Sequence, residues 1–246
     1  MFPDVTFSAL VENHFAFMGA QRGDLHRKGA AIELVGRADF LSWWAPLIAD
    51  VEVPPEATTV RLFPWSDESW PPRLADLGFR MSSELSYLDC PVRPGTAATL
   101  PDGVTIEVVA SDADVDAFAT VQTAGFAEPA DTDEDLAWWR EFLIEEARRN
   151  STDPAQTFYV LRADGVPAAV SLTVVTDGVC GVYGVATSPE FRRRGYANQL
   201  LDRIRVDAYA RGDERLALQV EPDSAAERIY LAAGFEPRFR STLYSR

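Results

Sequence analysis

The sequence predicts an α/β protein in which a mixed sheet carries helices on both faces. Two observations lead to this prediction. In the second half of the chain, segments typical of strands alternate with segments of helical period, in the order β-α-α-β-β-β-α-β-α-β. Hydrophobic residues make up 47% and charged residues 25% of the 246 residues, as in ordinary globular chains with a sizeable core.

The elements of the second half begin and end at suitable residue types. Ser111 and Thr132 are expected to cap two helices that end at Ala124 and Arg149. Asp-Gly turns join three of the expected strands into hairpins. The expected strands are residues 104–109, 157–162, 167–175, 179–186, 215–220 and 238–244, and the expected helices are 111–124, 132–149, 197–211 and 224–233.

Charge and rare residues exclude several classes of function. The net charge of −15 disfavours nucleic acid and anionic membranes and favours a cationic or amine-bearing partner, either a small molecule or a peptide. Two cysteines, Cys90 and Cys180, cannot form a disulfide framework or a metal cluster, and the two histidines, His14 and His26, make a zinc site or a Ser-His-Asp triad improbable. Neither a membrane-spanning run nor a secretory signal is present, so we expect a cytoplasmic protein without a metal.

Residues 192–197, Arg-Arg-Arg-Gly-Tyr-Ala, lie between an expected strand and an expected helix. A glycine there lets the backbone approach a ligand, and the free N–H groups of a helix start favour an anion. Three arginines add positive charge to an otherwise acidic chain. The loop is therefore a candidate pyrophosphate site, and a solvated basic turn is the alternative.

Residues 216–235, further along the chain, indicate a function more specifically than the loop does alone. The strand 216–220 is followed by Asp-Ser-Ala-Ala at 223–226, then by Ile229-Tyr230 and Gly234-Phe235. With the Arg-x-x-Gly-x-Ala loop, this order resembles the GNAT superfamily of acyl-CoA-dependent N-acyltransferases from about residue 103 to residue 246. One departure is Asp223, which stands where the family usually has asparagine.

The resemblance implies acetyl-CoA as co-substrate and a role for each matching residue. The loop would bind the CoA pyrophosphate, the strand end before it would pair with the pantetheine arm, and residues before the last helix would contact that arm. Tyr230 would protonate the departing CoA thiolate, although a core aromatic beside Phe235 is the alternative. The implied CoA-binding residues are Val185, Ala186, Thr187, Arg192, Arg193, Arg194, Gly195, Tyr196, Ala197, Asp223 and Ser224.

The general base is left open by the sequence. The expected strand 179–186 holds no acid, and the strand before Tyr230 offers Gln219. Eight acids lie between Glu128 and Glu146, and most of them fit a solvated helix face. Glu128 or Asp131 could attract a cationic acceptor, and a water relay to a remote carboxylate is equally compatible. Trp138 and Trp139 are expected to pack in the core on one side, and a platform for the substrate is the alternative.

The first half looks like a second copy that lacks the chemistry. A shift of 156 residues aligns Gly78-Phe79 with Gly234-Phe235, Val60-x-Leu62 with Leu216-x-Leu218, and Trp44 and Ile48 with Leu200 and Ile204. Asp39 then stands at the Gly195 position and Leu74 at the Tyr230 position. We expect two GNAT-like mixed-sheet domains, a degenerate one at 1–95 and a catalytic one at 103–246, joined by a linker over 90–103; chance similarity of two β-α-β units is the alternative.

The sequence thus favours an N-acetyltransferase that moves acetyl from acetyl-CoA to a primary amine by direct attack in a ternary complex. A non-catalytic acyl-CoA-binding sensor is the alternative, and a transferase of longer acyl groups is a third reading. The acceptor class stays open among antibiotics, amino acids, polyamines and protein N-termini. The oligomeric state is open as well.

Overall fold

A computed structural model describes residues 5–95 and 99–246 of the chain. Two compact units make up the fold: the first contains residues up to Cys90 together with Ala217–Arg246, and the second contains Pro91–Leu216. These units do not coincide with the expected domains 1–95 and 103–246. Part of the expected linker, residues 96–98, lies outside the described residues, and Cys90 belongs to a strand.

The second unit contains four antiparallel strands in the order β9-β8-β7-β6, with three helices. Asp-Gly pairs with positive φ close both of its hairpins: Asp164 and Gly165 between β7 and β8, and Asp177 and Gly178 between β8 and β9. This is the turn chemistry that the sequence predicts. The elements are β6 (Val104–Val108), α3 (Asp112–Phe126), α4 (Asp133–Asn150), β7 (Gln156–Ala163), β8 (Val166–Thr176), β9 (Val179–Thr187) and α5 (Tyr196–Arg211).

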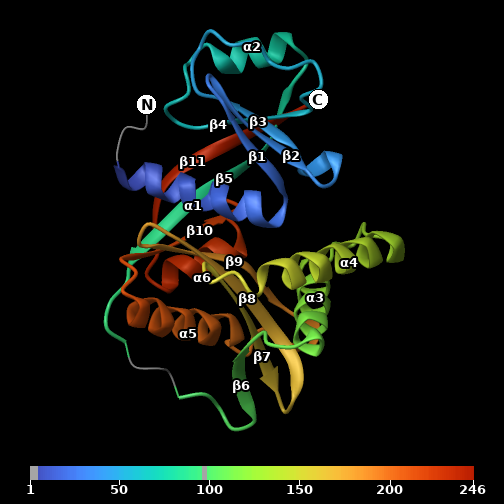
Figure 1. Ribbon diagram of the computed structural model, residues 1–246, viewed down its shortest axis with the longest axis vertical. Coiled ribbons are helices and arrows are strands. Elements are labelled where there is room, and N and C mark those ends of the chain that lie inside the picture. The colour runs from blue at the N-terminus through green and yellow to red at the C-terminus, as the bar shows by residue number, and fades with distance from the viewer. Residues whose placement is uncertain (1–4, 96–98) are drawn as a thin grey trace. The chain divides into compact units, whose positions relative to one another are not determined.

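Two neighbouring residues of β7 show that α3 and α5 cover opposite faces of this sheet (Figure 1). The Phe158 ring packs edge-on against Phe118 of α3 at 5.1 Å between centroids. The Tyr159 hydroxyl donates a 3.0 Å hydrogen bond to Asp207 of α5. Because successive side chains of a strand point to opposite faces, the expected helix–sheet–helix layering is confirmed.

The starts of α3 and α4 follow the sequence prediction, and the end of α3 does not. Ser111 and Thr132 each form a reciprocal capping box with the aspartate three residues later. Helix α3 continues through Gly125 to Phe126, so the predicted end at Ala124 is wrong. Gly125 has no positive φ, and its missing side chain instead lets the helix pack tightly against β9.

The first unit contains the strands β1-β2-β3-β4-β11-β5-β10 in that order, with β10 entering it at Ala217. Trp43 packs against Phe15 of α1 and Trp44 against Trp70 of α2, so these helices cover opposite faces. The elements are α1 (Val5–Gln21), β1 (Gly23–Lys28), β2 (Ala31–Gly36), β3 (Trp43–Pro46), β4 (Thr59–Leu62), α2 (Trp70–Asp76), β5 (Arg80–Pro91), β10 (Arg215–Val220), α6 (Ala225–Ala232) and β11 (Glu236–Ser245).

The 156-residue offset relates one β-α-β segment to another. Strand β4, helix α2 and the start of β5 correspond to β10, α6 and the start of β11. The offset does not extend to α5: Trp44 lies in strand β3 and Ile48 lies outside helices and strands, so the alignment of these residues with Leu200 and Ile204 of α5 is wrong. Four buried residues in a row and pairing with β2 and β4 explain why this segment is a strand.

Strand β11 is inserted between β4 and β5. Thr242 is opposite Leu62 of β4, and Phe239 is opposite Tyr87 of β5. The last strand of the chain therefore completes the sheet of the first unit. Within the described ranges, no helix is both long and apolar enough to cross a membrane.

Candidate active site

The loop at 192–197 presents a row of unpaired backbone donors. Arg193 and Gly195 both have left-handed backbone conformations, with φ of 63° and 79°. Gly195 is the N-cap of α5, and the first helical bond runs from the Gln199 N–H to the Gly195 carbonyl. The N–H groups of residues 193–198 have no acceptor in the described part of the chain. Together with the α5 dipole, they form a site suited to an anion.

The space in front of Gly195 is open. A Cβ atom added there would meet no protein atom within 4 Å, so nothing in the protein fills the place that a side chain would take. Glycine is favoured here by its positive φ, and a ligand can approach the bare backbone. Tyr196 is buried, with its ring 6.4 Å from that of Phe191, and so contributes its backbone to the loop.

The arginines of the loop differ in what they contact. Arg192 donates from Nη2 to the Gly125 carbonyl at 3.0 Å and from Nε to the Thr187 carbonyl at 3.3 Å. Arg194 lies over the Phe191 ring and donates to the Glu190 carbonyl. Arg193 is exposed and forms no ion pair with described residues. Arg192 thus anchors the loop to α3 and β9, while Arg193 is left to add positive charge.

The end of β9 is bent by a bulge. The pairing of β8 with β9 shifts register between Val170 and Leu172, and Gly184 at this place has a φ of 58°. The Ser171 hydroxyl donates to the Tyr183 carbonyl and fixes the bulge. Bulges redirect the backbone that follows them. The strand end expected to receive the pantetheine arm, Val185 to Thr187, follows directly.

Tyr230 lies on α6 in the first unit. Its ring packs edge-on against Phe235 at 5.9 Å, so the expected packing contact is present. Its hydroxyl has no hydrogen-bond partner among the residues described. Burial raises the pKa of Tyr230 to about 12, which keeps the phenol protonated at neutral pH.

The residues before α6 hold the start of that helix. Ser224 is the N-cap and accepts from the Glu227 N–H at 3.0 Å. Asp223 has a φ of 62°, and its N–H donates to the Glu227 carboxylate. The Asp223 side chain is 89% exposed, so its carboxylate is accessible to a ligand.

The candidate acceptor-side acids lie in the turn between α3 and α4. The Asp131 carboxylate accepts from the Glu128 N–H at 2.7 Å, which closes the turn. Glu128 is exposed. Trp138 is 41% exposed and stacks on Phe142, and Trp139 is half-buried. These tryptophans pack on each other along α4, so the expectation that they belong to the core is only partly met.

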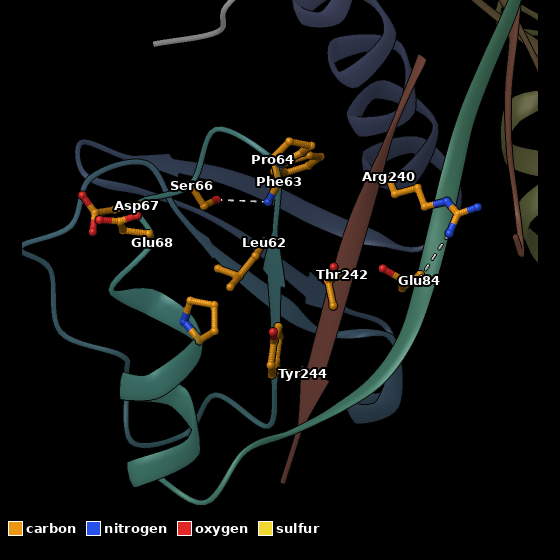
Figure 2. A pocket seen from close by; sticks show the side chains of 11 residues that line it. Leu62, Phe63, Pro64, Ser66, Asp67, Glu68, Glu84, Arg240, Thr242 and Tyr244 are labelled. Atoms are coloured by element: carbon orange, nitrogen blue, oxygen red, sulfur yellow. Dashed lines mark hydrogen bonds and ion pairs between the residues drawn. The ribbon is translucent and has the colours of Figure 1, made fainter. Parts of the chain in front are cut away.

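The first unit contains a pocket of about 280 Å³ beside the start of α2 (Figure 2). Asp67, Glu68 and Glu84 line it, and Arg240 faces Glu84 at 3.9 Å. Hydrogen bonds from Ser69 hold the pKa of Asp67 below its usual value, so that carboxylate stays charged. The excess of negative charge makes this pocket unsuitable for the phosphates of CoA.

Comparison with known proteins agrees with the geometry of the loop. Residues 117–235 match the Acetyltransferase (GNAT) family, and this segment contains α5, the loop before it and α6. This family uses acetyl-CoA. The unpaired N–H groups of residues 193–198 and the open space at Gly195 fit the pyrophosphate of that co-substrate.

Proteins whose names describe them as acetyltransferases or GNAT proteins are similar to part or most of this chain. A mycothiol acetyltransferase of Tsukamurella paurometabola is 32% identical over 163 residues, which are 61% of this chain and 54% of that protein. The chain therefore spans about half the length of this curated relative. A GCN5-related N-acetyltransferase from Kribbella flavida has a TM-score of 0.68 at 22% identity, covering 96% of this chain and 95% of that one. A tandem GNAT protein from the clavulanic acid biosynthesis pathway has a TM-score of 0.55 at 14% identity, covering 89% and 80%.

Proposed function

We propose that the protein transfers the acetyl group of acetyl-CoA to a primary amine by direct attack within a ternary complex. The observation that carries this proposal is the row of unpaired N–H groups at residues 193–198, placed at the start of α5. The family match of residues 117–235 supports the same reaction.

Each part of the site has one task in this proposal. The backbone of residues 193–197 binds the pyrophosphate, with Arg193 adding charge and Arg192 keeping the loop in place. The backbone of Val185 to Thr187 binds the pantetheine arm and orients the thioester carbonyl. Asp223 and Ser224 contact the same arm.

The reaction needs a neutral amine and a proton for sulfur. The amine nitrogen forms a bond to the carbonyl carbon, the carbon–sulfur bond breaks, and Tyr230 gives its proton to the departing thiolate. The pKa of Tyr230, about 12, keeps this proton available across the physiological range. Cys180 is buried and the pKa of its thiol is raised to about 12, which does not suit a covalent acyl intermediate.

The amine must lose a proton before attack. Strand β9 contains no acid, so we assign proton removal to a water molecule that passes the proton to an exposed carboxylate. Glu128 is the candidate for this carboxylate, because the Asp131 carboxylate already accepts the hydrogen bond that closes the turn. The acceptor is an amine-bearing and cationic small molecule or peptide, as the net charge of −15 favours. The name of the curated relative, mycothiol acetyltransferase, points toward a small molecule.

The chain is a tandem protein whose first copy is degenerate. The matching offsets of β4-α2-β5 and β10-α6-β11 support a duplication, and a tandem GNAT protein is among the similar structures. Before β4 the first copy has a three-residue turn that begins at Asp39 and then strand β3, whereas before β10 the second has Gly195 and helix α5. Leu74 of the first copy aligns with Tyr230 of the second copy and has no hydroxyl group.

Release of free CoA from acetyl-CoA, measured against a panel of amines, tests the proposal. We expect turnover with at least one amine and none in the Gly195→Asp variant. The lack of an acid on β9 favours a second candidate, a non-catalytic acyl-CoA sensor. Tight binding of acetyl-CoA without turnover of any amine would support the sensor and contradict the transferase.

A further inference from the structure

Helix α3 crosses the bulged part of β9 at very short range. A Cβ atom on Gly125 would lie 2.7 Å from the Ala186 Cβ and 3.1 Å from the Thr187 nitrogen. A Cβ atom on Gly184 would lie 2.8 Å from Nε2 of Gln122. The absence of side chains at both glycines thus brings the Gln122 carboxamide against the bulge that precedes Val185.

The Oε1 atom of Gln122 has no hydrogen-bond partner among the described residues. The side chain is 4% exposed, and its Oε1 atom is fully buried without a hydrogen bond to any described residue. Buried side-chain oxygens are hydrogen-bonded in the great majority of folded proteins, and one left without a donor costs stability. A donor supplied by a ligand would give that oxygen a hydrogen bond.

We propose that Gln122 binds the attacking amine of the acceptor and positions it over the thioester carbonyl. This inference rests on the proposed acetyltransferase function, in which Val185 to Thr187 orient that carbonyl. The last torsion of a glutamine side chain is broad and roughly two-fold, so rotation brings Oε1 to the present place of Nε2 beside the bulge. There Oε1 accepts an N–H of the amine and leaves the nitrogen lone pair free for attack.

The uncharged state of the carboxamide suits this task. A carboxylate at the same place would stabilise the ammonium form and raise the pKa of the amine, which would keep the lone pair protonated. Glutamine offers an acceptor oxygen without that penalty. Gln122 is thus a positioning residue that acts through the amine.

The test is the Gln122→Met variant, which keeps the volume of the side chain and removes its polar atoms. We expect kcat/KM for the amine to fall about tenfold, the loss of one hydrogen bond, while the calorimetric affinity for acetyl-CoA stays unchanged. The melting temperature should stay equal or rise, because an unpartnered buried oxygen is removed. Thr123→Val is the matched control, since it removes another buried and unpartnered oxygen from the same helix, and it should leave kcat/KM for the amine unchanged.

A structural role predicts a different pattern. If Gln122→Met melts at a lower temperature while kcat/KM for the amine stays at the wild-type value, the carboxamide serves only the fold and the inference is wrong. A wild-type chain that acetylates no amine overturns the proposed function, and this role of Gln122 with it. A working wild type with an unimpaired Gln122→Met variant overturns the role alone.

Discussion

At the scale of single residues, the site depends on two left-handed backbone positions. Arg193 and Gly195 turn the chain so that successive N–H groups are left without protein acceptors at the start of α5. Such conformations cost energy for residues other than glycine. Arg192 compensates by tying the loop to carbonyls of α3 and β9.

Gly195→Asp should abolish the binding of CoA without unfolding the protein. The new carboxylate would occupy the open space that faces the N–H groups and would repel the pyrophosphate. Gly195→Asn is the matched control, because asparagine has nearly the same shape and tolerates a positive φ. Calorimetry should show weaker binding for the asparagine variant and none for the aspartate variant. Equal affinities in the two folded variants would contradict a role for charge.

Tyr230→Phe should keep the fold and lower kcat by about 10²-fold, at the low end of what a positioned general acid contributes. The ring contact with Phe235 is preserved, and only the proton donor is lost. The affinity for acetyl-CoA should change little, because the hydroxyl acts as charge develops on sulfur. Steady-state kinetics from pH 6 to pH 9 check this. Full kcat across that range would mean that water supplies the proton and Tyr230 only packs.

His14 should make the stability of the protein depend on pH. Burial, and then the positive charge of Arg61, lowers the pKa of His14 well below its ordinary value. Between that lowered value and about 6.5, the unfolded chain binds a proton that the folded chain does not, so stability falls as the pH falls, by up to about 1.4 kcal/mol per pH unit.

Denaturant unfolding between pH 5 and pH 7 measures this contribution. His14→Gln should remove it while keeping a hydrogen-bonding group near the Tyr87 hydroxyl, which now lies 2.6 Å from His14. If the variant and the wild type show the same slope against pH, His14 is not the group responsible.

At the scale of elements, β11 joins two parts of the sheet of the first unit. It pairs with β4 on one side and β5 on the other. Arg238 binds the buried Asp89 carboxylate, and Ser241 accepts a hydrogen bond from the buried Arg61. Phe239 stacks on Tyr87 at 4.5 Å. Strand β11 therefore contributes to the same core as residues near the start of the chain.

A chain that stops at residue 235 should lose the cooperative unfolding of the first unit. Removal of β11 leaves the facing edges of β4 and β5 unpaired and Asp89 without Arg238. Circular dichroism and amide hydrogen exchange during thermal unfolding measure the loss. Retention of exchange protection in β4 and β5 would show that this sheet closes without its inserted strand.

At the scale of the whole molecule, the two β-α-β segments that the 156-residue offset relates differ in the residues of their helices. The second segment contains Tyr230, and in the first segment Trp70 and Leu74 of α2 are fully buried under the sheet. The pocket beside α2 is acidic. If the proposed duplication is correct, the second copy contains the proposed proton donor and the first serves as a scaffold.

We predict that one chain binds one CoA, through the loop before α5. In the first unit, Asp39 begins a turn of only three residues, which has a carboxylate and no helix dipole to attract an anion. Titration calorimetry should give a stoichiometry of one. Two CoA molecules per chain, or electron density for CoA against residues 36–41 in a crystal structure, would contradict the assignment.

The sequence by itself determined the elements of the second half and the position of the loop. Their signals are local: Asp-Gly turns for the hairpins, Ser111 and Thr132 for the helix starts, and Gly195 for the α5 start. Local backbone preferences act within a few residues, so a single sequence contains them in full.

The tertiary structure decided what depends on residues far apart in the chain. These are the insertion of β11 between β4 and β5, the anchoring of Arg192 on Gly125, and the burial of an unpartnered Gln122 against Gly184. Gln122 occupies an ordinary helix position and gives no sequence signal. The 156-residue offset aligns Trp44 with Leu200, a residue of helix α5. Pairing with β2 and β4 instead makes the segment of Trp44 a strand. Contacts between distant segments override local preference because burial and strand pairing contribute more free energy than the intrinsic propensity of a few residues.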